Sequence, residues 1–299
     1  HRPRERNSLL VALLTSLVVA TANSPAHAAP NGAAASLDFR DDWRFTKGDP
    51  NGAAQPDHDD SAWSPVRLPH DWAIAGPFDP SAPSGSSAKL PWKGVGWYRK
   101  SFDLDRADGD RVYLDFDGVM AFPKVYINGQ LAGEWDYGYT PFRIDATPYV
   151  NLRGPNVVAV RVDTTKHGTR WYPGAGIYRK VMLELRKPVH IAEWGVFVTT
   201  PEVTDDRATV AAQIALDNHA DQPTDATVEL IVLDPDGNEV QRRTHETTLA
   251  PGQTTLDESF TIERPRRWDI LDPARYSLQS IVRVDGQTVD DRHTPFGIR

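Results

Sequence analysis

Two short stretches of the sequence combine aromatic rings with charged or imidazole side chains. His70 and Asp71 lie in LPHDW, and Arg170, Trp171 and Tyr172 open RWYPGAGIYR. Indole and phenol rings can stack on the apolar face of a sugar, while carboxylate and guanidinium groups suit its hydroxyls. The simpler alternative is that tryptophans fill the core and an aspartate caps a turn. The residue types therefore indicate a candidate carbohydrate-binding site.

Other kinds of chemistry are not indicated. The chain has no cysteine, which excludes disulfides, thiol catalysis and cysteine-ligated metals. The acidic run DHDDS (57–61) lacks the alternate ligand spacing and the glycine of a calcium loop, and is predicted to be a solvated turn. We therefore predict no metal site and no cofactor. A net charge of −8 without an extended basic run argues against a nucleic-acid partner.

The elements that must position these residues are strands. Apolar residues alternate with polar ones in DRVYLDFDGV (110–119) and in VMLELR (181–186), which is the pattern of half-buried strands. Asn128-Gly129 joins two such runs and predicts a type I′ hairpin turn. After the first residues no window carries a helical apolar stripe, and prolines recur too often to allow one. The predicted fold class is all-β.

The chain is predicted to contain two β domains behind a leader. Residues 1–28 combine early arginines, an apolar run and an Ala-His-Ala cleavage site, so they read as a signal peptide, followed by a linker over 29–36. This predicts a secreted or periplasmic protein with no membrane span once the signal is removed. Residues 37–187 fit a jelly-roll β-sandwich and residues 188–299 an immunoglobulin-like β-sandwich.

Six segments resemble a known family in order and spacing. LPHDW (68–72), GVGWYRKSF (94–102), VYINGQLAGEWDYGYTPFRIDAT (125–147) and RWYPGAGIYRKVML (170–183) resemble the N-terminal sugar-binding domain of glycoside hydrolase family 2, particularly its β-galactosidase-like members. WDILDPARYSL (268–278) and DDRHTPFGIR (290–299) resemble the immunoglobulin-like second domain of that family.

The resemblance implies a retaining β-glycosidase that needs no redox cofactor. Its two catalytic glutamates would lie on a (β/α)₈ barrel expected C-terminal to Arg299, so no catalytic residue is predicted in this chain, which should be inactive alone. Asn238-Glu239 matches the family's asparagine–glutamate pair, but it lies in DPDGNEV and is predicted to be a hairpin tip.

The same resemblance nominates substrate-binding residues. Asp71 would contact sugar hydroxyls, and Arg170 with Trp171 would line the same subsite, next to His70 and Tyr172. Several family members carry an acidic residue at the position of Arg170, where it binds hydroxyls or a metal ion. Because this sequence departs from that pattern, we do not predict a cation site there.

Three functional hypotheses remain at this point. The leading one is the noncatalytic N-terminal portion of an exported β-galactosidase-like enzyme, whose domains support the barrel and line its sugar subsite. The alternative is a free-standing, lectin-like carbohydrate-binding module. A third, a secreted adhesion protein, needs an exposed apolar patch that the sequence does not indicate. A β-galactoside is the predicted ligand, with glucuronate or mannose left open.

Overall fold

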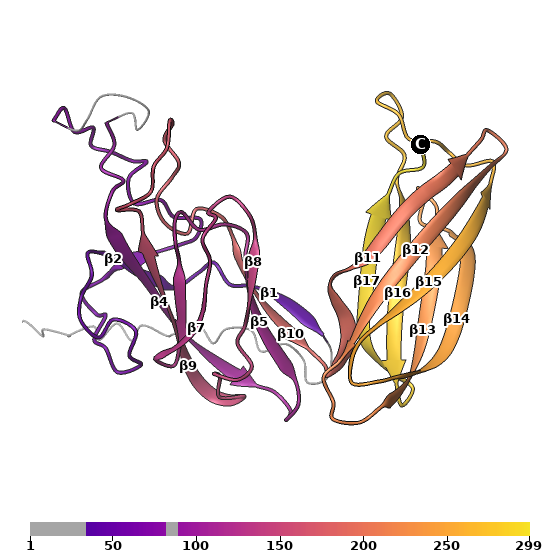
Figure 1. Ribbon diagram of the computed structural model, residues 1–299, viewed down its shortest axis with the longest axis horizontal. Coiled ribbons are helices and arrows are strands. Elements are labelled where there is room, and N and C mark those ends of the chain that lie inside the picture. The colour runs from indigo at the N-terminus through magenta and orange to yellow at the C-terminus, as the bar shows by residue number, and fades with distance from the viewer. Residues whose placement is uncertain (1–33, 82–88) are drawn as a thin grey trace, which may run out of the picture.

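The computed structural model describes residues 34–81 and 89–299, and every regular element in these two ranges is a β-strand (Figure 1). The predicted all-β class is therefore confirmed. The predicted signal peptide, residues 1–28, lies outside the described residues. Within the described ranges, no helix is long and apolar enough to cross a membrane.

The first domain is a jelly-roll sandwich of two antiparallel sheets. Its larger sheet has the strand order β3-β2-β4-β9-β6-β7, and the smaller one has the order β1-β10-β5-β8. The strands are β1 (Ala35–Asp38), β2 (Trp43–Lys47), β3 (Ser64–Val66), β4 (Val95–Asp105), β5 (Arg111–Phe116), β6 (Lys124–Ile127), β7 (Gln130–Glu134), β8 (Phe142–Asp145), β9 (Arg153–Asp163) and β10 (Val181–Arg186).

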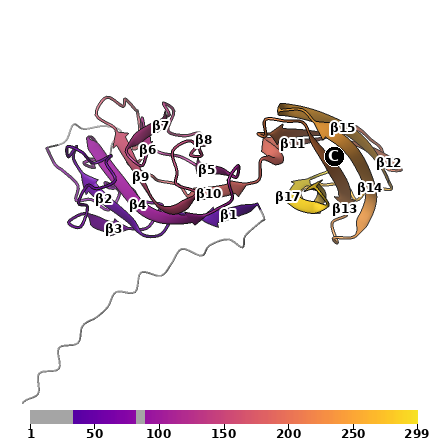
Figure 2. The ribbon, with the colours of Figure 1, turned by 90° about the horizontal axis from the view of Figure 1, so that it is seen from below.

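The second domain is an immunoglobulin-like sandwich that follows directly after β10. Sheets ordered β11-β12-β15 and β14-β13-β16-β17 enclose a separate core, and the two sandwiches lie one after the other along the long axis of the molecule (Figure 2). The strands are β11 (Val189–Val203), β12 (Arg207–Asn218), β13 (Thr224–Leu233), β14 (Glu239–Leu249), β15 (Gly252–Glu263), β16 (Tyr276–Val284) and β17 (Gln287–Phe296).

Strand β1 begins earlier than the sequence indicated. Ala35 and Ser36 lie in the range predicted to be a linker, 29–36, but they pair with Leu185 and Glu184 of β10. The linker prediction is therefore wrong for these two residues. The physical reason is that β10 would otherwise leave a row of backbone groups unpaired at the edge of its sheet.

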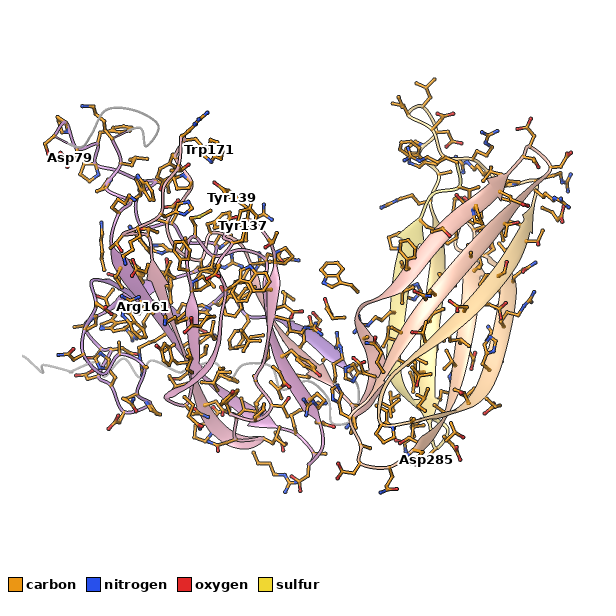
Figure 3. All side chains as sticks on the ribbon, viewed as in Figure 1. Asp79, Tyr137, Tyr139, Arg161, Trp171 and Asp285 are labelled. Atoms are coloured by element: carbon orange, nitrogen blue, oxygen red, sulfur yellow. The ribbon has the colours of Figure 1, made fainter. Side chains whose placement is uncertain are left out.

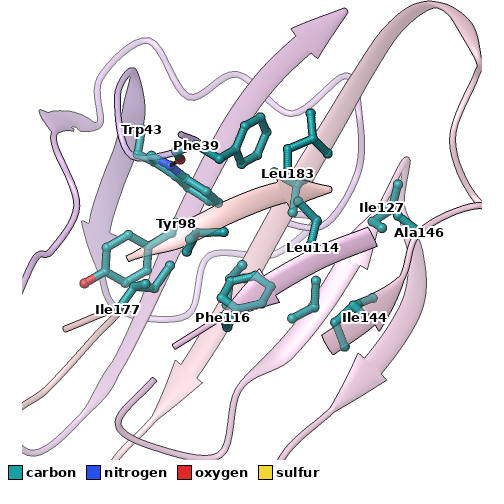
Figure 4. Close-up of a cluster of buried hydrophobic side chains, with 14 of the residues drawn as sticks. Phe39, Trp43, Tyr98, Leu114, Phe116, Ile127, Ile144, Ala146, Ile177 and Leu183 are labelled. Atoms are coloured by element: carbon teal, nitrogen blue, oxygen red, sulfur yellow. Dashed lines mark hydrogen bonds between the residues drawn. The ribbon is translucent and has the colours of Figure 1, made fainter. Parts of the chain in front are cut away.

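The core of the first domain follows from alternation along the strands. Leu114, Phe116 and Leu183 are almost completely buried between the two sheets, together with Ile127 from β6 and Ile144 from β8 (Figure 4). The hairpin that joins β6 to β7 also follows the prediction. Asn128 and Gly129 have φ values of 49° and 83°, the left-handed conformation that a type I′ turn requires.

The outer face of the smaller sheet is also covered, which simple alternation does not predict. Tyr113, Glu184 and Arg186 point away from the core and are nevertheless buried. Glu184 accepts hydrogen bonds from Ser36 and from Arg186, so each buried charge has a partner. Tyr113 lies at the junction with the second domain, because its hydroxyl is 3.3 Å from His219 Nε2.

The acidic run at residues 57–61 has a structural role. Arg99 on β4 is only 2% exposed, and its Nε donates to Asp60 Oδ2 at 2.9 Å. Its NH1 group also donates to the carbonyl oxygens of Ala53 and Gln55, at 2.7 and 2.9 Å. Asp60 thus has a role beyond the predicted solvated turn: its side chain is 26% exposed, and it supplies the charged partner that a buried guanidinium requires.

We expect Arg99→Leu to lower the free energy of unfolding by about 3–5 kcal/mol, because it leaves Asp60 and two carbonyl oxygens without their donor. Urea denaturation followed by tryptophan fluorescence reports mainly on the first domain, which holds seven of the nine tryptophans. The control is Arg153→Leu, since this arginine is also on a strand but its side chain is 65% exposed in its ion pair with Asp108. Equal urea midpoints for the two variants would contradict a stabilising role of the Arg99 contacts with Asp60 and the two carbonyl oxygens.

Candidate functional site

The two nominated stretches lie next to each other in space. The amide of His70 donates to the carbonyl of Ile177 at 2.8 Å, and that of Trp72 donates to the carbonyl of Ala175 at 3.0 Å. On its other side, Gly176 exchanges two backbone hydrogen bonds with Met120, at 2.9 and 2.7 Å. Residues 172–177 therefore connect two other loops of the sandwich, which places LPHDW beside RWYPGAGIYR.

Glycine is required where these loops meet. Gly176 has a φ of +120°, and a Cβ there would overlap the Tyr98 hydroxyl and lie 2.8 Å from the carbonyl oxygen of His70. Gly174 has a φ of +91°, and its Cβ would lie 3.4 Å from Asp71 Oδ2. Only a residue without a side chain fits this backbone without strain. The glycines thus allow the loop to approach Asp71 closely.

The carboxylate of Asp71 is fixed by three donors. Its Oδ1 accepts the amides of Ala73 and Ile74 at 2.9 and 3.2 Å, and the hydroxyl of Tyr172 at 2.6 Å. Burial raises the pKa of Tyr172, and the neighbouring Asp71 raises it further. The phenol therefore remains protonated and acts as a donor. Because these contacts all use Oδ1, the orientation of Oδ2 is set before any ligand arrives.

An aromatic surface lies beside this carboxylate. The Trp171 side chain is 58% exposed, and its Nε1 donates to the hydroxyl of Tyr139 at 2.8 Å. Tyr137 packs against Tyr139 edge to face, with ring centroids 5.7 Å apart. Figure 3 shows all three rings at one end of the first domain. The indole is thus oriented by a hydrogen bond at its edge while much of the side chain remains open to solvent.

Arg170 and His70 have different surroundings. Arg170 is exposed, and its guanidinium forms no hydrogen bond or ion pair with any residue that the structure describes. His70 points inward: its Nδ1 lies 2.8 Å from the Tyr98 hydroxyl and its ring packs on Phe45. Burial lowers the pKa of His70, which favours the neutral imidazole. His70 therefore supports the loop from below, and its predicted sugar contact stays a prediction.

Sequence reasoning missed Tyr137 and Tyr139. They stand in DYGYT, within a segment quoted for its order and spacing, and the two tyrosines one residue apart were the available signal. Tyr178 was also missed. Its hydroxyl donates to the carbonyl oxygen of Gly138 at 2.8 Å, which attaches the DYGYT loop to the end of RWYPGAGIYR.

The pair Asn238-Glu239 lies at a hairpin, as predicted. The Asn238 amide nitrogen Nδ2 is 3.1 Å from Asp234 Oδ2, and Glu239 is exposed and paired with Arg242. Both side chains are used in local turn and strand contacts.

Comparison with known protein families matches both domains. Residues 84–188 match the family model described as glycosyl hydrolases family 2, sugar binding domain. Residues 189–299 match the model described as glycosyl hydrolases family 2. The two matches meet between Pro188 and Val189, in the short connection from β10 to β11.

Individual relatives give the same result. The chain is 40% identical over 265 residues to the β-galactosidase BoGH2A of Bacteroides ovatus, covering 88% of this chain and 31% of the relative. It is 30% identical over 263 residues to a putative β-glucuronidase of Formosa agariphila, covering 87% of this chain and 25% of that protein. The chain thus spans a quarter to a third of the length of these curated relatives.

Solved structures agree with the sequence matches. A glycosyl hydrolase family 2 member from Bacteroides cellulosilyticus superposes with a TM-score of 0.81 at 32% identity, over 88% of this chain and 36% of that one. A β-glycosidase from Bacteroides vulgatus gives a TM-score of 0.79 at 31% identity, over 89% of this chain and 34% of that one. The similarity thus extends across both sandwiches.

Gly176→Ala should destabilise the first domain by at least about 2 kcal/mol, because the new Cβ meets Tyr98 and His70 at a strained φ. Urea unfolding followed by tryptophan fluorescence measures this. Gly168→Ala is the matched control, since a Cβ there has no atom within 4 Å. A Gly176→Ala variant as stable as Gly168→Ala would refute the close packing of the three loops.

Proposed function

We propose that this chain, which belongs to glycosyl hydrolase family 2, is the noncatalytic N-terminal part of an exported, retaining β-galactosidase-like enzyme. Its first domain would line the sugar subsite of a catalytic barrel that follows Arg299. Export is proposed from the signal-like residues 1–28. The proposed subsite rests on one observation: the carboxylate of Asp71 is oriented by hydrogen bonds, and the solvent-exposed indole of Trp171 lies in the adjacent loop.

The geometry of Asp71 suits a hydroxyl-rich ligand. A carboxylate whose Oδ1 is held by two amides and by Tyr172 can offer Oδ2 to sugar hydroxyls without first losing rotational freedom. Trp171 can stack against the apolar face of the ring, and Arg170 can donate to further hydroxyls. Charged hydrogen bonds of this kind contribute about 1.5–3 kcal/mol each.

The position of the C-terminus supports a pocket that a following domain completes. The C-terminus and the end of the first domain that carries Trp171 lie on the same side of the molecule (Figures 1 and 3). A barrel that continues from Arg299 therefore starts on the side where these loops project. Catalytic sites of such barrels form at the face built by the loops after the strands.

In a retaining mechanism, the proposed barrel would break the glycosidic bond and this chain would bind the sugar. Two barrel carboxylates would protonate the glycosidic oxygen and attack the anomeric carbon, and then release the sugar to water. The residues of this chain would bind and orient the nonreducing sugar. Binding contacts distant from the reacting bond contribute to catalysis by fixing that bond between the two carboxylates.

Galactose is the proposed sugar. One match named as a β-galactosidase is 40% identical to this chain, whereas one match named as a putative β-glucuronidase is 30% identical. A glucuronide carries a carboxylate in place of the C6 hydroxymethyl group of a galactoside and has the opposite configuration at C4, and the exposed Arg170 could attract that carboxylate. Assays should therefore include β-galactosides and β-glucuronides side by side.

Asp71→Asn in the full-length enzyme should reduce kcat/KM for the preferred chromogenic glycoside by about ten- to a hundredfold. Asparagine keeps an acceptor oxygen for the two loop amides, so the change is mainly the loss of charge. The control Asp108→Asn removes a carboxylate that is 89% exposed on a remote loop. An unchanged kcat/KM for Asp71→Asn would exclude this residue from the subsite.

The open Trp171 also favours the alternative of a free-standing carbohydrate-binding module. We expect the chain alone to hydrolyse no chromogenic β-galactoside and to bind galactosides weakly, because it would supply only part of the pocket. Hydrolysis assays and titration calorimetry on residues 29–299 test this. Tight binding that Trp171→Ala abolishes would favour the module, and turnover by the purified chain would refute the assignment of catalysis to the barrel.

A further inference from the structure

A second cluster of functional side chains lies in the other domain, away from the sugar-site loops. It consists of His190 on β11, Asp217 near the end of β12, and His219 just beyond that strand. One potential ligand atom from each residue lies within 4.8 Å of those of the other two. His190 and Asp217 are direct cross-strand partners, and the amide of His219 donates to the carbonyl of Pro188 at 2.9 Å. The backbone therefore holds the three residues in a fixed arrangement.

The hydrogen bonds of His190 and Asp217 leave a suitable atom of each for a metal ion. His190 Nδ1 lies 2.7 Å from the carbonyl oxygen of Lys187, so it must carry the proton, and the lone pair is on Nε2. This is the usual way in which a neighbouring carbonyl orients a metal-binding histidine. Asp217 Oδ1 accepts a hydrogen bond from Gln253 at 2.9 Å, and Oδ2 is the second oxygen of the same carboxylate.

The charges near the cluster also suit a cation. Asp217 and Asp290 supply negative charge near His190. Arg111 lies near His219 but is itself paired with Asp145 at 2.6 Å, which reduces its repulsion of a bound ion.

We propose that His190, Asp217 and His219 form a Zn²⁺ site where the second domain meets the first. Two imidazole nitrogens and one carboxylate oxygen are ligands that zinc prefers, and three protein ligands leave a fourth position for water. Tetrahedral zinc needs ligand atoms about 3.3 Å apart. The three ligand atoms here lie within 4.8 Å of one another, and rotation of the exposed His219 side chain can bring them closer.

The position of the cluster gives the ion a consequence for the whole chain. Tyr113 of the first domain reaches it: the hydroxyl is 3.3 Å from His219 Nε2 and the ring packs edge to face on His190. The two imidazole rings stack with their centroids 5.3 Å apart. An ion that binds His190 and His219 would therefore also stabilise the contact between Tyr113 of the first domain and the second domain. This site is independent of the proposed sugar subsite.

The test is calorimetric titration of ZnCl₂ into untagged chain that has been dialysed against a chelator at pH 7.5. We expect one Zn²⁺ per chain with a dissociation constant below about 10 μM, and a higher unfolding temperature with zinc. His219→Ala and Asp217→Asn should each weaken binding by at least about tenfold. CaCl₂ should give no binding heat, because a hard cation prefers an all-oxygen site.

Two variants keep the outcome decisive. His293→Ala is the control, since it removes an exposed histidine that lies 4.0 Å from Asp291 elsewhere on the same domain. It should bind zinc as the unchanged protein does. His219 is exposed, so His219→Ala should fold even if replacing the buried His190 does not. Absence of zinc binding, or the same affinity in His219→Ala as in His293→Ala, would overturn the proposal.

Discussion

The loop edge of the first domain depends on the passage of the backbone at Gly176. Its amide and carbonyl both bond Met120, while neighbouring carbonyls accept the amides of His70 and Trp72. No side chain fits at this point, because Tyr98 and the His70 carbonyl fill the space. These backbone contacts bring together three loops that are far apart in the sequence. These backbone contacts at Gly176 therefore determine where the surface side chains of the three loops lie.

The same crossing connects the site to the core. Ile177 follows Gly176 directly and is completely buried beside Tyr98 in the main hydrophobic cluster (Figure 4). The hydroxyl of Tyr98 then meets His70, and the loop above it presents Asp71. A rigid sandwich thus supports an exposed binding surface through a few well-packed residues. This arrangement is typical of β-sandwich proteins, in which loops on a stable scaffold carry the function.

Buried charge is confined to positions where a partner is close. Arg99 on the larger sheet pairs with Asp60 in the loop before β3, and Glu184 pairs with Arg186 on the smaller sheet. The first domain therefore uses these buried ion pairs on the outer faces of its sheets, and keeps accessible polar groups such as Arg170 for its open end. In the proposed enzyme, that end would form one wall of a pocket whose other wall belongs to the barrel.

The sequence by itself determined the features that depend on neighbouring residues. Period-two alternation identified the strands 111–116 and 181–186, and Asn128-Gly129 identified a hairpin, because strand faces and tight turns are local properties. The order of the motifs identified the family.

Only the tertiary structure decided which distant groups meet. Tyr172 and Asp71 are 101 residues apart and share a hydrogen bond, and Trp171 finds Tyr139 across 32 residues. Asp60 was expected to be solvated, and β1 was expected to begin later, because alternation in one strand does not show what covers it. The cluster of His190, Asp217 and His219 has no motif spacing at all. It exists because an antiparallel register places residues of β11 opposite the end of β12.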